Sequence, residues 1–430
     1  MPKFTPKEWN ASGAIYSYGT MDLRCFVVEV VLNEDVDGEL LQAAVDKALV
    51  RLHYYRQTFV REGGLYYYAY NDLPFVVGNC DKPRAVGGAA TNYHMVDVTY
   101  AASTVRFAMN HAFCDGLGLN RLIEATLYHY FCLKDHKEYA SDGIYTEDVP
   151  YDPAEEFDAY AKKTNADVEK LKQLANGEKR FRIPELGKPG TQGPTMYRFP
   201  IKVRTEELLG WCKACGGSPA SAISAFAAKT VEMEHHPDEG VIMNVLPISL
   251  RRFLHADKTF KNCSAAAFLP VKSEDARSKT SAELAAQLRG VMKQQMGEEM
   301  ALLLSSSVNM MTHLGKKMPF FFLKTKVLSM PQTRPQDTFY VDYVGGLKTP
   351  GYEDRITDVR YLNADPCGGS VFILMSETAG FFHISFSQTF PDDRYRQAFC
   401  KVLDEAGIPY ESLPADTYLN PVVEMPPEQK

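Results

Sequence analysis

The stretch MNHAFCDGLG, residues 109–118, separates a segment typical of a β-strand from a segment typical of a helix. Residues 104–109 (TVRFAM) are rich in β-branched and apolar side chains, which favours a strand. After the glycines, one face at helical spacing carries Leu119, Leu122, Ile123, Thr126, Leu127, Tyr130 and Phe131. We therefore expect His111 to lie where the chain leaves a sheet, a position that holds a side chain rigidly. An imidazole with an ordinary pKa near ~6.5 can remove a proton at neutral pH and return it later.

The rest of the first half alternates strand and helix patterns. Residues 25–32 (CFVVEVVL) form a continuous β-branched and aromatic run, as in a mostly buried strand. Asp37 can cap a helix whose apolar face continues to Leu52. Residues 58–60 and 65–70 flank a turn with two glycines, which predicts a hairpin.

The second half repeats this alternation after a different kind of segment. Residues 134–198 contain an acidic stretch and end in a run rich in proline and glycine, as expected of a crossing between two halves. Expected strands lie at 241–246, 265–271, 338–344, 371–375 and 380–387, and expected helices begin near Thr205, Ser218, Ser281 and Asp393. The sequence thus predicts an α/β or α+β protein with mixed sheets, divided into residues 1–165, a linker at 166–200 and residues 201–430.

Composition excludes several classes of protein. The chain has 430 residues, 45% of them hydrophobic and 23% charged, which is ordinary for a globular protein. With 47 Lys and Arg against 54 Asp and Glu, no basic surface for nucleic acid is expected. Nine scattered cysteines, no signal-like N-terminus and no apolar run long enough to span a bilayer predict a soluble, cytoplasmic protein with reduced thiols.

The segment from His111 to Gly116 resembles the His-x-x-x-Asp-Gly motif of the CoA-dependent acyltransferase superfamily, which includes chloramphenicol acetyltransferase, alcohol acetyltransferases and peptide-condensation domains. Weaker resemblances follow in the same order along the chain, at residues 37–56, 218–219, 246–252, 260–263, 341–345 and 383–387. The resemblance implies two chloramphenicol acetyltransferase-like subdomains, each a mixed sheet flanked by helices. It also implies an active-site tunnel between them, and an arm from the second half that joins the first.

The resemblance also implies a mechanism and a set of site residues. His111 would deprotonate a hydroxyl or amine acceptor, which attacks an acyl thioester, either acyl-CoA or a phosphopantetheine thioester on an acyl-carrier protein. The expected partners are therefore a small-molecule acyl donor and acceptor, with no metal, resident cofactor or covalent acyl-enzyme. Around the catalytic His111, structural roles are expected for Asp115, Gly116 and Arg251, and substrate contacts for Asn110, Tyr343 and Ser387.

Arg251 is the predicted partner of Asp115. A buried carboxylate needs a partner because an unpaired charge in a low dielectric is costly. In the families that this chain resembles, the arginine at the end of this strand pairs with the motif aspartate, and a planar guanidinium suits a carboxylate. The competing interpretation is that Asp115 only caps the following helix while Arg251 lies on the surface beside Arg252.

The chain departs from its relatives at several positions. Many condensation domains have two adjacent histidines, whereas Asn110 precedes His111 here, and Ser249 stands where the family has an aspartate before the arginine. The alcohol acetyltransferase-like branch fits these departures best. Two alternatives stay open: a stand-alone condensation-like enzyme that uses carrier-protein thioesters, and a non-catalytic homologue that only binds a ligand. Acyl length, the acceptor, the oligomeric state and the residue that stabilises the oxyanion are not specified by the sequence.

Other clusters give weaker signals. Cys212 and Cys215 form a CxxC pair without the second pair that a zinc site needs, so core packing is expected. Packing is also expected for Cys114, inside the histidine motif. The apolar run at 318–323 (MPFFFL) could line an acyl tunnel or touch a membrane, but ordinary core is the favoured interpretation.

Overall fold

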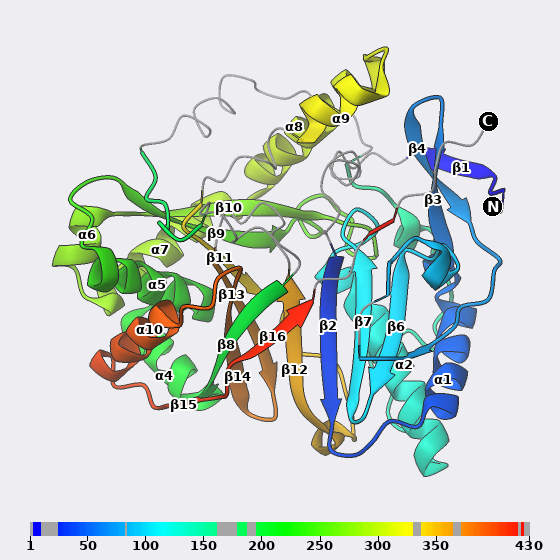
Figure 1. Ribbon diagram of the computed structural model, residues 1–430, viewed down its shortest axis with the longest axis horizontal. Helices are drawn as coiled ribbons and strands as arrows, with labels where there is room; N and C mark the ends of the chain where they lie inside the picture. Colours follow the sequence, from blue (N-terminus) through cyan, green and yellow to red (C-terminus); the bar gives the residue numbers. More distant parts are fainter. Residues whose placement is uncertain are drawn as a thin grey trace.

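Two mixed sheets, each covered by helices, form the body of the molecule in the computed structural model (Figure 1). The structure describes residues 3–9, 25–81, 84–160, 179–186, 195–329, 337–363, 371–419 and 423–424. The five-stranded sheet has the order β12-β2-β7-β6-β5, and a larger sheet contains β10-β9-β11-β13-β14-β8-β15 with β16 paired to β8. A third, small sheet has the order β1-β4-β3. The expected fold class is confirmed.

The first half builds most of the five-stranded sheet and the two helices on one of its faces. Its elements are β1 (Pro6–Trp9), β2 (Cys25–Leu32), α1 (Gly38–Arg51), β3 (Gln57–Glu62), β4 (Leu65–Tyr70), β5 (Gly78–Asn79), β6 (Val96–Ala101), β7 (Thr104–Asn110) and α2 (Gly116–Asp135). Asp37 caps α1 as predicted, because its Oδ1 accepts the N–H groups of Glu39 and Leu40. Alternate residues of β2 belong to separate buried clusters on its two faces, which explains why its sequence is apolar apart from Glu29.

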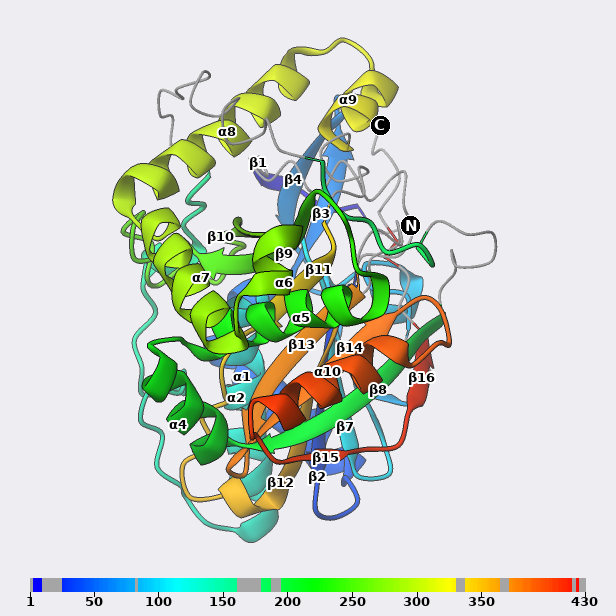
Figure 2. The same ribbon diagram turned by 90° about the vertical axis from the view of Figure 1, so that its left-hand side faces the viewer.

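The second half forms the larger sheet and its covering helices, which face the viewer in Figure 2. Its elements are β8 (Thr195–Arg204), α4 (Thr205–Cys215), α5 (Pro219–His235), β9 (Val241–Ser249), β10 (Ser264–Lys272), α6 (Ser273–Ser278), α7 (Ser281–Gln295), α8 (Glu298–Lys317), α9 (Phe321–Ser329), β11 (Phe339–Tyr343), β12 (Ile356–Asn363), β13 (Val371–Thr378), β14 (Phe381–Gln388), α10 (Arg394–Glu405), β15 (Tyr410–Ser412) and β16 (Asp416–Leu419). Ser218 caps α5 with Pro219 at the first helical position, as predicted. Thr205 does not cap α4, because Arg204 stands at the cap position without a side-chain hydrogen bond.

The second half of the chain contributes one strand to the sheet of the first half. Strand β12 leaves the second half and pairs antiparallel with β2, with Val359 opposite Val30, so it forms the edge of the first sheet. The arm implied by the resemblance is therefore present. The expected boundaries, with a second subdomain that starts at residue 201, place this strand in the second subdomain, whereas it belongs to the first sheet. The expected linker also ends early, because β8 begins at Thr195; residues 166–178 and 187–194 lie outside the described residues.

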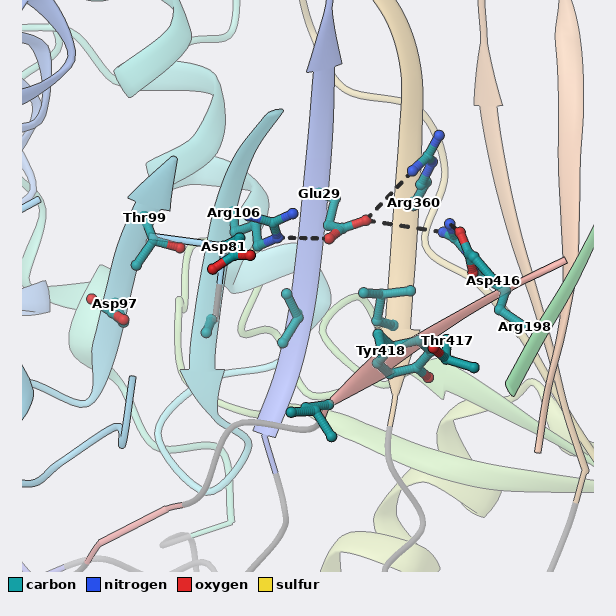
Figure 3. A pocket seen from close by; sticks show the side chains of 14 residues that line it. Glu29, Asp81, Asp97, Thr99, Arg106, Arg198, Arg360, Asp416, Thr417 and Tyr418 are labelled. Carbon is teal, nitrogen blue, oxygen red and sulfur yellow. Dashed lines mark hydrogen bonds and ion pairs between the residues drawn. The ribbon is translucent and has the colours of Figure 1, made fainter. Parts of the chain in front are cut away.

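A cluster of charged side chains marks the junction of the two sheets (Figure 3). Glu29 of β2 accepts a hydrogen bond of 2.7 Å from Nε of Arg106, and its carboxylate lies 3.8 Å from Arg360 and 4.0 Å from Arg198. Arg198 of β8 also pairs with Asp416 of β16. These contacts join β2, β7, β12, β8 and β16 around a cavity of about 300 Å³.

Helices α8 and α9 extend away from the two sheets (Figures 1 and 2). Phe320, directly before α9, and Phe322, its second residue, are 58% and 65% exposed, and their rings stack with centroids 5.9 Å apart. The expectation that residues 318–323 lie in the core is therefore wrong for these two side chains. Within the described ranges, no helix combines the length and the apolar character that crossing a bilayer would require.

Candidate active site

His111 lies directly after the end of β7, at the wall of a cavity of about 140 Å³ that both halves of the chain line. The first half contributes Phe26, His111, Asp115, Gly116 and Leu117. The second half contributes Pro247, Ile248, Ser249, Arg251, Ser264, Asp342, Tyr343 and Val344. Helix α2 begins at Gly116, so the short loop that carries His111 is held at one end by a sheet and at the other by a helix. A small molecule that binds here would contact the imidazole.

Asp115 and Arg251 form the predicted ion pair across the two halves. Nη1 and Nη2 of Arg251 donate to the two carboxylate oxygens of Asp115 at 2.8 and 2.7 Å, the parallel geometry that a guanidinium favours. Arg251 also donates to the carbonyl oxygens of Thr259 and Lys261, both at 3.0 Å. Asp115 accepts the N–H groups of Gly118 and Cys263 at 2.9 Å each, so the side chain also caps α2. The pair and the helix cap are thus both present.

Burial and pairing act in opposite directions on the pKa of Asp115. Burial disfavours the charged carboxylate, but the neighbouring guanidinium of Arg251 and the hydrogen bonds outweigh it and hold this pKa below its ordinary value. Asp115 is therefore an anion at neutral pH and has no proton to give or take. Its place in the site is structural, since it fixes the loop between β7 and α2.

Glycine is required twice at the start of α2 because other chain segments come close. A β-carbon on Gly116 would lie 2.9 Å from Cγ1 of Val344, which belongs to the cavity wall contributed by the second half. A β-carbon on Gly118 would lie 2.1 Å from the carbonyl oxygen of Phe260. The sequence analysis gave Gly116 a structural role but did not single out Gly118. Both glycines allow the segments of the second half to close over the histidine loop.

Asn262 is a neighbour of His111 that the sequence analysis did not assign to the site. Its Nδ2 group donates to the carbonyl oxygen of His111 at 3.1 Å and lies 3.3 Å from Nδ1 of the ring. The amide orientation is set by Ser264, whose N–H and hydroxyl both approach Oδ1 of Asn262, at 3.2 and 2.9 Å. The only feature of the sequence that pointed to Asn262 was its position in residues 260–263, a segment that resembles an element of the family.

Of the three residues expected to contact the substrate, Tyr343 lines the cavity, whereas Asn110 and Ser387 do not. Asn110 is fully buried, and its Oδ1 accepts the N–H of Ala112 at 2.9 Å, so it shapes the histidine loop and is not among the residues that line the cavity. Ser387 lies buried in β14, opposite Phe372 and Arg198, and does not line the cavity either. Tyr343 lines the cavity, but its hydroxyl donates to Glu377 at 3.0 Å and its ring packs against the core of the second half.

The cysteines near the site are buried rather than poised for reaction. Burial raises the pKa of the Cys114 thiol well above its ordinary value, so the reactive thiolate is disfavoured. Burial likewise raises the pKa of Cys212 to about 12. Among the residues that the structure describes, no group of three or more His, Cys, Asp or Glu side chains could hold a metal ion.

Solved structures with this arrangement come from several proteins. The chain is similar to polyketide synthase associated protein 5 from Mycobacterium tuberculosis, with 13% identity and a TM-score of 0.64 over 93% of this chain and 98% of that one. It is also similar to TRI101 of F. sporotrichioides in complex with coenzyme A and T-2, with 10% identity and a TM-score of 0.62 over 94% and 99%. The first condensation domain of the calcium-dependent antibiotic synthetase matches with 12% identity and a TM-score of 0.61 over 92% and 94%. No protein-family model and no curated protein sequence matches the chain.

These similarities define the class of fold. The chain has the two-subdomain fold that CoA-dependent acyltransferases share with peptide-condensation domains. Within that class it carries a histidine at the cavity between the halves, on a loop held by an ion pair that crosses from one half to the other. The fold expected from the sequence is confirmed; at these identities, the similarity alone does not extend to substrates.

Proposed function

We propose that this protein is an acyltransferase that moves an acyl group from a thioester, acyl-CoA first of all, to a hydroxyl or amine acceptor, with His111 as general base. The observation that carries this proposal is the position of His111 in a cavity lined by both halves, in a fold shared by TRI101 in complex with coenzyme A and by the trichothecene 15-O-acetyltransferase TRI3. The loop is rigid because Asp115 is bound by Arg251 from the opposite half. No resident cofactor is needed for this reaction, because the thioester is a co-substrate.

The proposed reaction is a direct transfer in two steps. The acceptor oxygen or nitrogen forms a bond to the thioester carbonyl carbon while its proton moves to the unprotonated ring nitrogen of His111. The tetrahedral intermediate then collapses, the carbon–sulfur bond breaks, and the imidazolium returns the proton to the departing thiolate. The products are the ester or amide and a free thiol, so atoms and charge balance without an external acid or base.

Asn262 would assist by controlling the ring of His111. The amide Nδ2 group of Asn262 lies 3.3 Å from Nδ1 of the His111 ring, a contact whose direction depends on the ring tautomer. The same group donates to the carbonyl oxygen of His111 at 3.1 Å, a bond that does not depend on the tautomer. In either tautomer Asn262 anchors the base to the second half of the chain.

The decisive experiment measures thiol release. The purified protein is mixed with acetyl-CoA or longer acyl-CoAs and a panel of alcohols and amines, and free CoA is quantified by chromatography, since the chain has nine cysteines that would react with a thiol dye. Acceptor-dependent CoA release that disappears in His111→Ala supports the proposal. If thiol is released only when the acyl group is carried by an acyl-carrier protein, the donor is a protein-bound thioester and not acyl-CoA. Ligand binding without turnover would contradict an enzymatic function.

A further inference from the structure

Asp342 is a carboxyl group at the same cavity as His111, and the mechanism above does not use it. Successive side chains of a β-strand point to opposite faces. In β11, Val341 and Tyr343 pack against the core of the second half, whereas Tyr340 and Val344 pack against the core of the first half. Asp342 therefore shares the face that is directed toward the first half, where the cavity and His111 lie.

Among the residues that the structure describes, Asp342 has no positively charged partner. The residue is half-buried, and the burial of its carboxyl group raises its pKa to about 7; the backbone of Tyr343, the next residue, offers an opposing hydrogen bond, and the charge that acts on it is the anionic Asp115. Arg251 is the cation among the described residues that line the cavity, and all three of its guanidinium nitrogens already bind Asp115 or backbone carbonyl groups. A cationic ligand in the cavity would supply Asp342 with a partner.

We propose that Asp342 is a subsite for a positively charged group of the acyl acceptor, so that the acceptor class is a hydroxyl- or amine-bearing molecule with an additional ammonium group. The proposal rests on the proposed acyltransferase function. The ammonium group that binds Asp342 is distinct from the attacking group, because a protonated amine has no lone pair with which to attack a thioester. The cavity of about 140 Å³ suits a compact amino alcohol or diamine.

The physical reason is the cost of a buried charge without a partner. An isolated carboxylate in a protein interior is unfavourable, whereas a carboxylate paired with a hydrogen-bonded cation is stabilised. A cationic acceptor would therefore bind to the ionised form of Asp342. The groups that face it from neighbouring elements are His111 on the histidine loop, Asp115 at the start of α2, Arg251 after β9 and Tyr361 of β12. Of these, His111 is also a titratable group, so the experiment must control for it.

The experiment compares the binding of two matched probes, 3-amino-1-propanol and 1,3-propanediol, by ligand-observed NMR titration without an acyl donor. At pH 8 the wild type should bind the amino alcohol about 10- to 100-fold more tightly, as expected for a hydrogen bond between charged groups. With a pKa of about 7, the ionised fraction of Asp342 falls about tenfold between pH 8 and pH 6, and the preference should fall with it. His111→Ala should keep both the preference and its pH dependence.

Asp342→Asn is the matched variant, because an amide has the same shape and can still donate a hydrogen bond but carries no charge. It should bind both probes equally at either pH, and Asp342→Ser provides a second uncharged side chain if the amide variant fails to fold. Equal binding by the wild type at pH 8, or a preference that survives in the folded Asp342 variants, would overturn the proposal. So would loss of acyl transfer in Asp342→Asn with unchanged probe binding, which would indicate a role in the chemical step.

The two proposals fail in different ways. A preference for the amino alcohol in a protein that transfers no acyl group would support the subsite and contradict the proposed function. Acyl transfer to neutral alcohols without any preference for the amino alcohol would support the function and contradict the subsite.

Discussion

Replacing Arg251 by methionine should destabilise the protein by about 3–5 kcal/mol, the usual cost of leaving a buried charge without its partner. Arg251 is only 7% exposed and makes two hydrogen bonds to Asp115 and one each to the carbonyl oxygens of Thr259 and Lys261. Methionine fills much of the same volume, so the loss reports on charge and hydrogen bonding rather than on a cavity. The remaining N–H groups of Gly118 and Cys263 cannot neutralise the carboxylate of Asp115.

Urea denaturation followed by circular dichroism measures this loss, with Arg252→Met as the control, because Arg252 is the exposed neighbour in sequence. The control should change stability by less than about 0.5 kcal/mol. Adding Asp115→Asn to Arg251→Met should recover part of the loss, because it removes the stranded charge. Equal effects of the Arg251 and Arg252 substitutions, or strictly additive effects of the Arg251 and Asp115 substitutions, would refute the view that the pair holds the two halves together.

Four further outcomes are expected. His111→Ala should lower the rate of acyl transfer by ~10²–10⁴ while leaving the circular dichroism spectrum unchanged, and a variant that keeps most of its activity would exclude a general base at this position. When chemistry limits the rate, kcat/KM for a neutral acceptor should rise with pH through the ordinary histidine range, and a flat profile from pH 5 to 9 would contradict the mechanism. The raised pKa of Asp342 means that the protonated carboxyl group contributes to stability in acid and that this contribution is lost as the pH rises from about 4 to about 7. Asp342→Asn should therefore be more stable than the wild type by about 2–4 kcal/mol at pH 8, but not at pH 4. Urea denaturation at the two pH values measures the difference. Gly118→Ala should lower the thermal midpoint, because the added methyl group would meet the Phe260 carbonyl oxygen at 2.1 Å, whereas Gly210→Ala, at a position with open space, should not.

The sequence by itself determined the local features of this protein. The mostly apolar run at 25–32, interrupted only by Glu29, indicates a strand that is buried on both faces, and Asp37 and Ser218 start helices where their side chains bind free N–H groups. The strand, loop and helix around His111 also follow from neighbouring residues. Each of these signals depends on interactions within a few residues, so it is visible in the linear sequence.

The tertiary structure alone decided which distant segments meet. Asn262 reaches His111 across 151 positions, and β12, which is not among the strands expected from the sequence, joins the first sheet. Asp342 lines the cavity as well as its predicted neighbour Tyr343, because which residues of a strand reach a cavity depends on the elements packed against it. Arg251 was matched to Asp115 only through resemblance to a family, since no local pattern links residues 136 positions apart. Such contacts follow from the packing of whole sheets. The free energy of burying two surfaces against each other selects the register of each strand and the face that it turns to the core, and no short segment of sequence specifies this choice.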